Sequence, residues 1–348
     1  MKSNVNRRFA ECCFLVLIGA VSAVVAFVAS SAGALANTTV PVRSSGTTLH
    51  LYVSEPGMHR ILRFPLDPTG LPAMQPDAVI TGLAGPSGLA IGPDNRLYVA
   101  DDVAHRLAIY EPGPGTGSKP SHVLSLPYAF GIGAVGVDGD GFVYAGYDVK
   151  CGYLGPCANA DVYSALPSGN EKPIATYRLG GSPPRAFGTA LVVNAQHLLT
   201  ALSSGQPEIY SGAPKRPNET PYPLFCPAIV GWGAAWGPGN ELYLTDIGGH
   251  HSPPQPSQVI VIPNFLKGSI PNCPASYAIT SATIPLNNPF GMATSGGLLY
   301  VTSIYNPSAK SALVFVLDPS KAGAQTPLAI VDGPASLLSA PYALAIGL

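Results

Sequence analysis

The most reactive group of side chains in the sequence lies in one short stretch, Asp246-Ile-Gly-Gly-His250-His251. Two adjacent imidazoles beside a carboxylate can ligate a metal ion or act as a general acid and base. The alternative is a solvated histidine pair in a Gly-rich loop, and the sequence favours it because the comparable loops at 203–206 and 303–310 contain no histidine. Asp246, His250, His251 and Asp148 are the weak candidates for catalysis.

Two other loops repeat one arrangement of an acid, a histidine and an arginine. Glu55 is followed by His59-Arg60, and Asp101 is followed by His105-Arg106. A pairing that recurs at the same spacing is more typical of loop structure than of catalysis, because each copy can bond across its own loop. We therefore expect these acids and arginines to fix the loops.

The elements that position these loops are indicated by Leu-Tyr cores that recur along the chain. The cores are anchored on Tyr52, Tyr98, Tyr144, Leu199, Tyr243 and Tyr300, at intervals of 46, 46, 55, 44 and 57 residues. The chain also contains 39 Gly, 37 Pro and 47% hydrophobic residues, which favours many short buried strands broken by turns. A repeating unit of this length with several strands is typical of an all-β propeller.

Each unit is predicted to form four strands, and the clearest unit has them at 88–91, 97–100, 106–110 and 121–126. The sequence Gly92-Pro93-Asp94-Asn95 predicts a tight turn between the first two strands. The stretch Val-Asp-Gly-Asp-Gly at 137–141 is predicted to be the same turn rather than a calcium loop, because it lacks the later acidic ligands.

The last residues, Pro-Tyr-Ala-Leu-Ala-Ile-Gly-Leu at 341–348, look like the first strand of a further unit. The other three strands of that unit are expected at 47–55, 59–66 and 77–81, so pairing between the two ends would close the ring and remove exposed sheet edges. First strands start near Gly88, Gly131, Gly188, Gly233, Gly291 and Ala343. This predicts six blades in one domain, residues 45–348, whereas five or seven blades would require a miscounted interval.

The stretch "PSGLAIGPDNRLYVADDVAHRLAIYEPG" at 86–113 resembles an NHL repeat, with its P-x-G-L-A, D-N turn, L-Y-V-A-D and H-R-L segments. Residues 51–64 resemble the second half of that repeat, with Glu55 in place of the aspartate. The resemblance implies a secreted propeller of bacterial type. It implies no single function, because propellers carry many unrelated functions.

In such a propeller, the segments that lead into the first strands and the loops between second and third strands open on one face, the channel face. Five of the six leading segments carry an aromatic residue before a small one. The predicted ligand-binding set is Phe130, Arg185, Phe187, Trp232, Phe290 and Tyr342. Such rings could line a pocket for a sugar, lipid-like or peptide ligand. The alternative, which the sequence favours, is that they plug the channel while glycines let the backbones approach.

The segments that lead into the first strands also indicate whether the channel could hold a catalytic metal ion. Calcium-dependent lactonases resemble this architecture and need an oxygen-rich cage at the channel centre. None of the six leading positions is Asp, Glu or His, and only Asn288 and Arg185 are polar nearby. Propeller lyases use histidines and a glutamate from neighbouring blades, and that set is also missing. The sequence further lacks a G-x-S-x-G elbow, a phosphate-binding Gly loop and an H-E-x-x-H motif.

Residues 1–36 have the pattern of a secretory signal peptide, followed by a short linker at 37–44. Lys2, Arg7 and Arg8 precede an apolar run at 14–28, and Ala34-Leu35-Ala36 fits a cleavage site. The alternative is an uncleaved N-terminal anchor. After cleavage, 15 basic and 18 acidic residues are left, and no later apolar run reaches the length of a membrane span. This charge balance argues against nucleic-acid binding.

Four cysteines follow the predicted signal peptide: Cys151, Cys157, Cys226 and Cys273. An even number in an exported chain predicts two disulfides, and the spacing favours Cys151–Cys157 and Cys226–Cys273 among three possible pairings. A zinc site of four thiolates is the alternative, although the C-x₂-C spacing is missing. The stretch 148–161 is expected to be a long loop, pinned by the first disulfide, that covers the channel.

These observations predict a secreted or periplasmic monomer that binds an unknown protein or small-molecule ligand through its channel face. We expect no bound nucleic acid, no membrane anchor after cleavage and no cofactor. The alternative is a propeller hydrolase, lactonase or lyase with Ca or Zn held near Asp246, His250 and Asp148. Whether the chain is an enzyme is left open, with binding favoured.

Overall fold

The computed structural model describes residues 47–127, 131–150, 156–179, 187–194, 197–203, 206–210, 222–223, 231–249, 255–263, 265, 276–306 and 311–348. All of them belong to one compact unit, Ala36–Leu348. The predicted signal peptide and linker lie outside the described residues, as do Cys151, Cys226 and Cys273, and only the backbone of Cys157 is described. Within the described ranges, no helix is long and apolar enough to cross a membrane.

The described strands form six sheets, which we number as blades 1 to 6, and the four strands of each blade pair antiparallel with their neighbours. Blade 1 contains β25 (Leu344–Gly347), β1 (His50–Glu55), β2 (Arg60–Pro65) and β3 (Ala78–Ile80). Blade 2 contains β4 (Pro86–Ile91), β5 (Leu97–Asp101), β6 (Arg106–Tyr110) and β7 (His122–Ser125). Blade 3 contains β8 (Gly131–Val137), β9 (Val143–Lys150), β10 (Pro156–Tyr163) and β11 (Ala175–Leu179).

The remaining blades have the same order from the inside to the outside. Blade 4 contains β12 (Phe187–Val193), β13 (Leu199–Ser203), β14 (Gln206–Tyr210) and β15 (Tyr222–Pro223). Blade 5 contains β16 (Ala234–Trp236), β17 (Leu242–Asp246), β18 (Gln258–Ile262) and β19 (Tyr277–Ser281). Blade 6 contains β20 (Pro289–Ser295), β21 (Leu298–Asn306), β22 (Ser311–Leu317) and β24 (Ala329–Val331). Two short helices, η1 (Pro56–Met58) and α1 (Gly333–Ser336), lie in loops.

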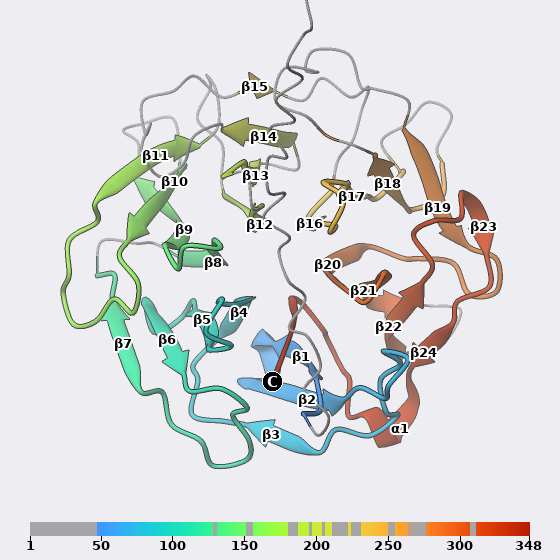
Figure 1. The fold of residues 1–348 in the computed structure, drawn as a ribbon, viewed down its shortest axis with the longest axis horizontal. Helices are drawn as coiled ribbons and strands as arrows, with labels where there is room; N and C mark the ends of the chain where they lie inside the picture. The colour runs from blue at the N-terminus through green and yellow to red at the C-terminus, as the bar shows by residue number, and fades with distance from the viewer. Residues whose placement is uncertain are drawn as a thin grey trace, which may run out of the picture. The chain divides into compact units, whose positions relative to one another are not determined.

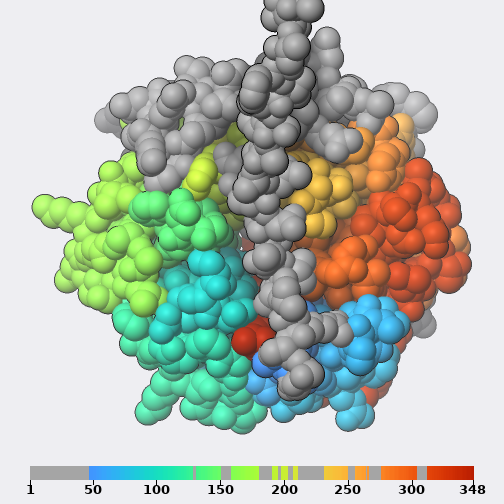
Figure 2. Space-filling model, in the orientation of Figure 1, coloured from blue at the N-terminus to red at the C-terminus, as the bar shows by residue number. Residues whose placement is uncertain are grey.

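Buried apolar side chains join each blade to the next. Six clusters of buried residues are present, and each draws its members from two neighbouring blades, including the pair of blades 6 and 1. In the cluster that joins blades 6 and 1, Leu51 of β1 packs with Tyr300 of β21. The blades are therefore packed face to face around one axis, with the first strands innermost (Figure 1). Figure 2, drawn in the same orientation as Figure 1, shows blades 2 and 3 side by side in cyan and green.

The predicted ring closure is confirmed. Strand β25 pairs antiparallel with β1, with Leu51 opposite Ile346 and Val53 opposite Leu344. The pairing extends upstream of β25, because the Tyr342 N–H donates to the Ser54 carbonyl at 2.8 Å and the Ser54 N–H donates to the Ala343 carbonyl at 3.1 Å. The six-bladed propeller predicted from the repeat is the observed fold.

The predicted turns between first and second strands are also confirmed. In blade 2, the Asn95 N–H donates to the Gly92 carbonyl at 2.9 Å, and in blade 3 the Gly141 N–H donates to Asp138 at 3.0 Å. Asn95 has φ 62° and Gly141 has φ 87°, a backbone region that Gly and Asn tolerate best. Val137-Asp-Gly-Asp-Gly141 is thus a strand-linking turn.

The fourth unit differs from the prediction by one residue. Thr200 pairs with Val192, as Tyr98 pairs with Ala90 in blade 2, so Thr200 rather than Leu199 occupies the position of the recurring tyrosine. The anchor at Leu199 was wrong because the fourth unit has no tyrosine, and only strand pairing reveals the register.

The stretch 148–161 is not a loop for most of its length, which corrects that prediction, while residues 151–155 at its tip, on which the predicted cover over the channel depends, lie outside the described residues. Strands β9 and β10 pair from Val143 opposite Tyr163 as far as Lys150 opposite Pro156. The ladder continues because successive backbone groups of both strands stay paired, so the segment extends blade 3.

The outer strands of blades 5 and 2 form backbone hydrogen bonds with a loop of the following blade. Residues Gly323–Gln325 form β23, which belongs to the loop before β24 of blade 6 but pairs in parallel with β19 of blade 5. The Gly169 N–H of blade 3 donates to the Val123 carbonyl of β7 at 2.8 Å. These loops cover strand edges that would otherwise be open to pairing with other chains.

Candidate functional site

The channel face is held in place by hydroxyl groups near the ends of three second strands. Thr245 Oγ1 accepts hydrogen bonds from the backbone N–H groups of Trp232 at 2.9 Å and Gly233 at 2.8 Å. Thr302 Oγ1 accepts one from Gly291 at 2.7 Å, and Ser54 Oγ accepts one from Ala343 at 3.0 Å. Each bonded N–H lies in the first strand of the same blade or in the residues directly before that strand. These bonds fix the backbone at, or directly after, the aromatic residues Trp232, Phe290 and Tyr342.

The repeated acids have the structural role that the sequence predicts. Arg60 lies 2.7 Å from Glu55, and Arg106 lies 2.8 Å from Asp101, while both carboxylates are fully buried. Asp101 Oδ1 also accepts the N–H groups of Ala84 at 2.8 Å and Gly85 at 2.7 Å. Each acid therefore ties the loop after the second strand to the segment that leads into the first strand.

Glycines allow the first strands to approach one another around the axis. A Cβ atom added at Gly88 would lie 2.6 Å from the Cα atom of Ala134 in the next blade. One added at Gly233 would overlap the carbonyl oxygen of Phe290, and one added at Gly291 would overlap that of Tyr342. The close approach of backbones that the sequence predicts at these glycines is confirmed.

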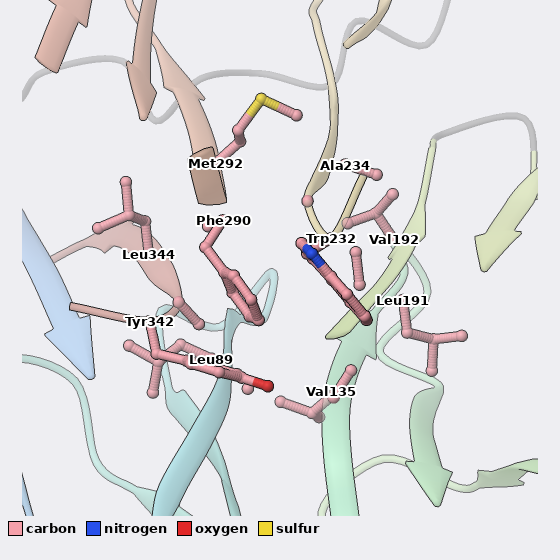
Figure 3. Close-up of a pocket in the computed structure, with 16 residues that line it drawn as sticks. Leu89, Val135, Leu191, Val192, Trp232, Ala234, Phe290, Met292, Tyr342 and Leu344 are labelled. Carbon is pink, nitrogen blue, oxygen red and sulfur yellow. The ribbon is translucent and has the colours of Figure 1, made fainter. Parts of the chain in front are cut away.

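Three aromatic side chains from neighbouring blades 5, 6 and 1 meet at the axis (Figure 3). The rings of Trp232 and Phe290 are stacked, with centroids 5.8 Å apart and planes inclined by 12°. The rings of Phe290 and Tyr342 have centroids 4.2 Å apart. All three side chains are only partly buried. We call this contiguous group of Trp232, Phe290 and Tyr342 the aromatic rim.

A small cavity lies on the axis beside the aromatic rim, and we call it the axial cavity. Its volume is about 40 Å³, and it is lined by residues of all six first strands and the segments leading into them. Its aliphatic lining side chains are Leu89, Val135, Leu191, Val192, Met292 and Leu344. Among the described residues that line it, Tyr342 is the only ionisable one. The cavity is far smaller than the sites of about 300 Å³ or more that bury drug-sized ligands.

Asp102 is the charged group that acts on the aromatic rim. Burial raises the pKa of the Tyr342 phenol, and the Asp102 carboxylate raises it further. The hydroxyl is therefore protonated at neutral pH and is a hydrogen-bond donor. Asp102 Oδ1 accepts the N–H of Ile132 in blade 3 at 2.8 Å. The sequence alone does not indicate this role of Asp102, because the role depends on a contact with the next blade.

The two predicted catalytic aspartates lie in different blades. Asp246 ends β17 of blade 5, where its Oδ2 accepts from Gln258 Nε2 at 2.9 Å and its Oδ1 accepts from the Gly248 N–H at 3.1 Å. Asp148 lies in β9 of blade 3, and blade 4 separates the two. In the part of the chain that the structure describes, no group of three or more His, Cys, Asp or Glu residues is arranged to hold a metal ion.

Several predicted site residues fall where the structure gives no description. His250, His251, Phe130 and Arg185 lie outside the described residues, and only the backbone of Phe187, in β12, is described. Of the predicted ligand-binding set, the structure thus brings together Trp232, Phe290 and Tyr342. Sequence reasoning missed the supporting hydroxyls, although a signal was present: Ser54, Thr245 and Thr302 each follow a core tyrosine by two positions.

Comparison with known proteins agrees with this architecture. Residues 83–110 match the family model of the NHL repeat. A search of curated protein sequences gives no significant match.

Solved structures similar to this chain include a chain of the nidogen/laminin complex, with 14% identity over 86% of this chain and 98% of that chain and a TM-score of 0.59. A protein of unknown function from Bacteroides caccae has 9% identity over 86% and 99%, with a TM-score of 0.59. A periplasmic gluconolactonase from Pseudomonas aeruginosa has 15% identity over 87% and 99%, with a TM-score of 0.52. At these identities the likeness concerns the fold. The chain is a six-bladed β-propeller that carries an NHL repeat in its second blade.

Proposed function

We propose that this propeller is a binding scaffold that takes a protein or small-molecule ligand at its channel face, without catalysis of its own. The observation that carries the proposal is the aromatic rim. Three large rings from three blades are left partly exposed and in mutual contact at the axis. Exposed aromatic groups of this kind are enriched in binding sites because they bury a large apolar area while losing little side-chain freedom.

The support around the rim favours binding rather than chemistry. Several polar groups at this face are engaged in structure: Thr245 holds the backbone at Trp232, and Thr302 holds the backbone at Gly291. Glu55 and Asp101 are paired with arginines. A rigid face with preformed apolar groups reduces the ordering cost of binding.

The fold itself is compatible with either role. A propeller of this kind occurs in the nidogen/laminin complex, and another is a gluconolactonase, so function has to be argued from the site. We further propose that the chain is exported as a monomer, on the basis of the signal-like residues 1–36 and the small excess of acidic residues after them.

Matched variants used as immobilised baits test the proposal. Phe290→Ala removes the central ring of the rim, and Ile174→Ala removes an exposed apolar side chain of the loop before β11. We expect a ligand from the exported fraction of the source cells to be retained by the wild type and by Ile174→Ala, and lost with Phe290→Ala while the circular dichroism of the variant is unchanged. Retention that is equal for all three baits would contradict binding at the rim.

A further inference from the structure

The axial cavity and the aromatic rim together have the properties of a pocket for one specific kind of group. We propose, on the basis of the binding function above, that the pocket anchors a single aliphatic side chain of leucine or valine size from a partner peptide. The volume of the cavity, its lining and two polar groups beside the rim support this assignment.

The volume sets the size of the group. A cavity needs roughly 10–15 Å³ to hold one water molecule, so about 40 Å³ holds about three groups of that size. A cavity that is known to bind benzene has a volume of roughly 150 Å³, several times larger. An aromatic side chain or a sugar ring is therefore too large, whereas the branched end of a valine or leucine side chain has the right number of atoms.

The lining sets the polarity of the group. The walls are formed by aliphatic side chains such as Val135, Leu191 and Leu344, and the rim adds three rings. A charged group placed there would lose its hydration without gaining a counter-charge from the lining, which is costly. The group is therefore uncharged and apolar, and its burial is the source of affinity.

Two polar atoms beside the rim favour a peptide over a lipid chain. The Tyr342 hydroxyl is a donor and makes no hydrogen bond to any other described residue. The Asp102 carboxylate, whose charge acts on the Tyr342 hydroxyl, accepts the Ile132 N–H through Oδ1, and among the described residues its Oδ2 accepts no donor. A peptide group offers one C=O and one N–H, so it complements this donor and acceptor, whereas an alkyl chain offers neither.

The test uses the fact that the chain has two tryptophans, Trp232 in the rim and Trp236 in β16. Trp236 packs edge-to-face on Phe265, and its indole N–H is buried with no hydrogen-bond partner among the described residues. Trp236→Phe therefore keeps the packing and leaves Trp232 as the single fluorescent reporter of the rim.

N-acetyl amino-acid methylamides are titrated into this variant up to their solubility limits. We expect a saturable change in Trp232 fluorescence with the leucine and valine amides, and each buried carbon beyond alanine should strengthen binding by up to about fourfold. The phenylalanine and lysine amides should bind no better than the alanine amide. Tyr342→Phe in the same background should weaken binding of the leucine amide and leave that of isobutanol, which has no amide, unchanged.

The inference would be overturned if no amide gave a saturable change in Trp232 fluorescence, or if the phenylalanine or lysine amide bound more tightly than the leucine amide. It would also be overturned if Tyr342→Phe did not weaken binding of the leucine amide. Isobutanol binding as tightly as the leucine amide would overturn it too and would indicate a lipid-type alkyl chain. If the amides fail while capture by the bait still depends on Phe290, only this inference falls. If both fail, the proposed binding function falls with it.

Discussion

Gly233→Ala is expected to lower the free energy of unfolding by at least about 3 kcal/mol, or to prevent folding, because the added Cβ would overlap the carbonyl oxygen of Phe290. The contact is with backbone, so no side-chain rotation can relieve it. Blades 5 and 6 would have to move apart at the point where Trp232 and Phe290 stack. Urea unfolding followed by circular dichroism measures the change.

Gly57→Ala is the matched control for this substitution. Gly57 lies in η1, has no other atom within 4 Å of an added Cβ and has no positive φ. Its replacement should change the free energy of unfolding by less than about 0.5 kcal/mol. If Gly233→Ala were as harmless as Gly57→Ala, the first strands could not approach each other as closely as described.

Asp101→Ala should cost about 3–5 kcal/mol of stability, because it removes a buried carboxylate that accepts from three donors, and each buried donor left without its partner costs about 1–3 kcal/mol. The Asp101 carboxylate is fully buried, and Arg106 lies 2.8 Å from it. The substitution also leaves the N–H groups of Ala84 and Gly85 without their acceptor. Asp101→Asn keeps an oxygen for these N–H groups, so it should be less damaging than Asp101→Ala.

An exposed ion pair provides the comparison. Lys321 lies 3.0 Å from Asp318, with 64% of its side chain exposed. Lys321→Ala should change the free energy of unfolding by less than about 1 kcal/mol, because solvent screens such pairs. Equal effects of Asp101→Ala and Lys321→Ala in urea would show that the Asp101 pair does not tie the channel face together.

The number and order of blades could be predicted from the sequence because the signals are local. A turn such as Gly92-Pro93-Asp94-Asn95 sets its own backbone geometry, and the Leu-Tyr core after the turn lies within the second strand. The pairing of Glu55 with Arg60 could also be predicted, because the two residues lie at the two ends of one short loop.

Features that depend on partners distant in the sequence could not be predicted. Strand β23 exists only because Gly323–Gln325 lies beside β19, and nothing in those three residues indicates a strand. The register of Thr200 depends on its pairing with Val192. Asp102 accepts a hydrogen bond from Ile132 and acts electrostatically on Tyr342, and these two residues belong to two other blades.

The candidate site likewise has features that the sequence predicts and features that it does not. Glycines and aromatic residues at the starts of first strands predicted a crowded axis with rings around it, and Gly233, Gly291 and Phe290 are found in that arrangement. The volume of the axial cavity depends on how closely six strands pack, and no local pattern contains that information.

Metal content of the purified chain tests most directly whether the channel face binds a ligand without metal-assisted catalysis. The chain is offered Ca²⁺ and Zn²⁺, dialysed and analysed by mass spectrometry, beside Asp246→Asn. The account predicts no stoichiometric ion in either protein, because the Asp246 carboxylate is occupied by Gln258 and Gly248, and Asp148 lies two blades away. A stoichiometric ion that the wild type retains and Asp246→Asn loses would contradict the account and favour a metal-assisted hydrolase, lactonase or lyase.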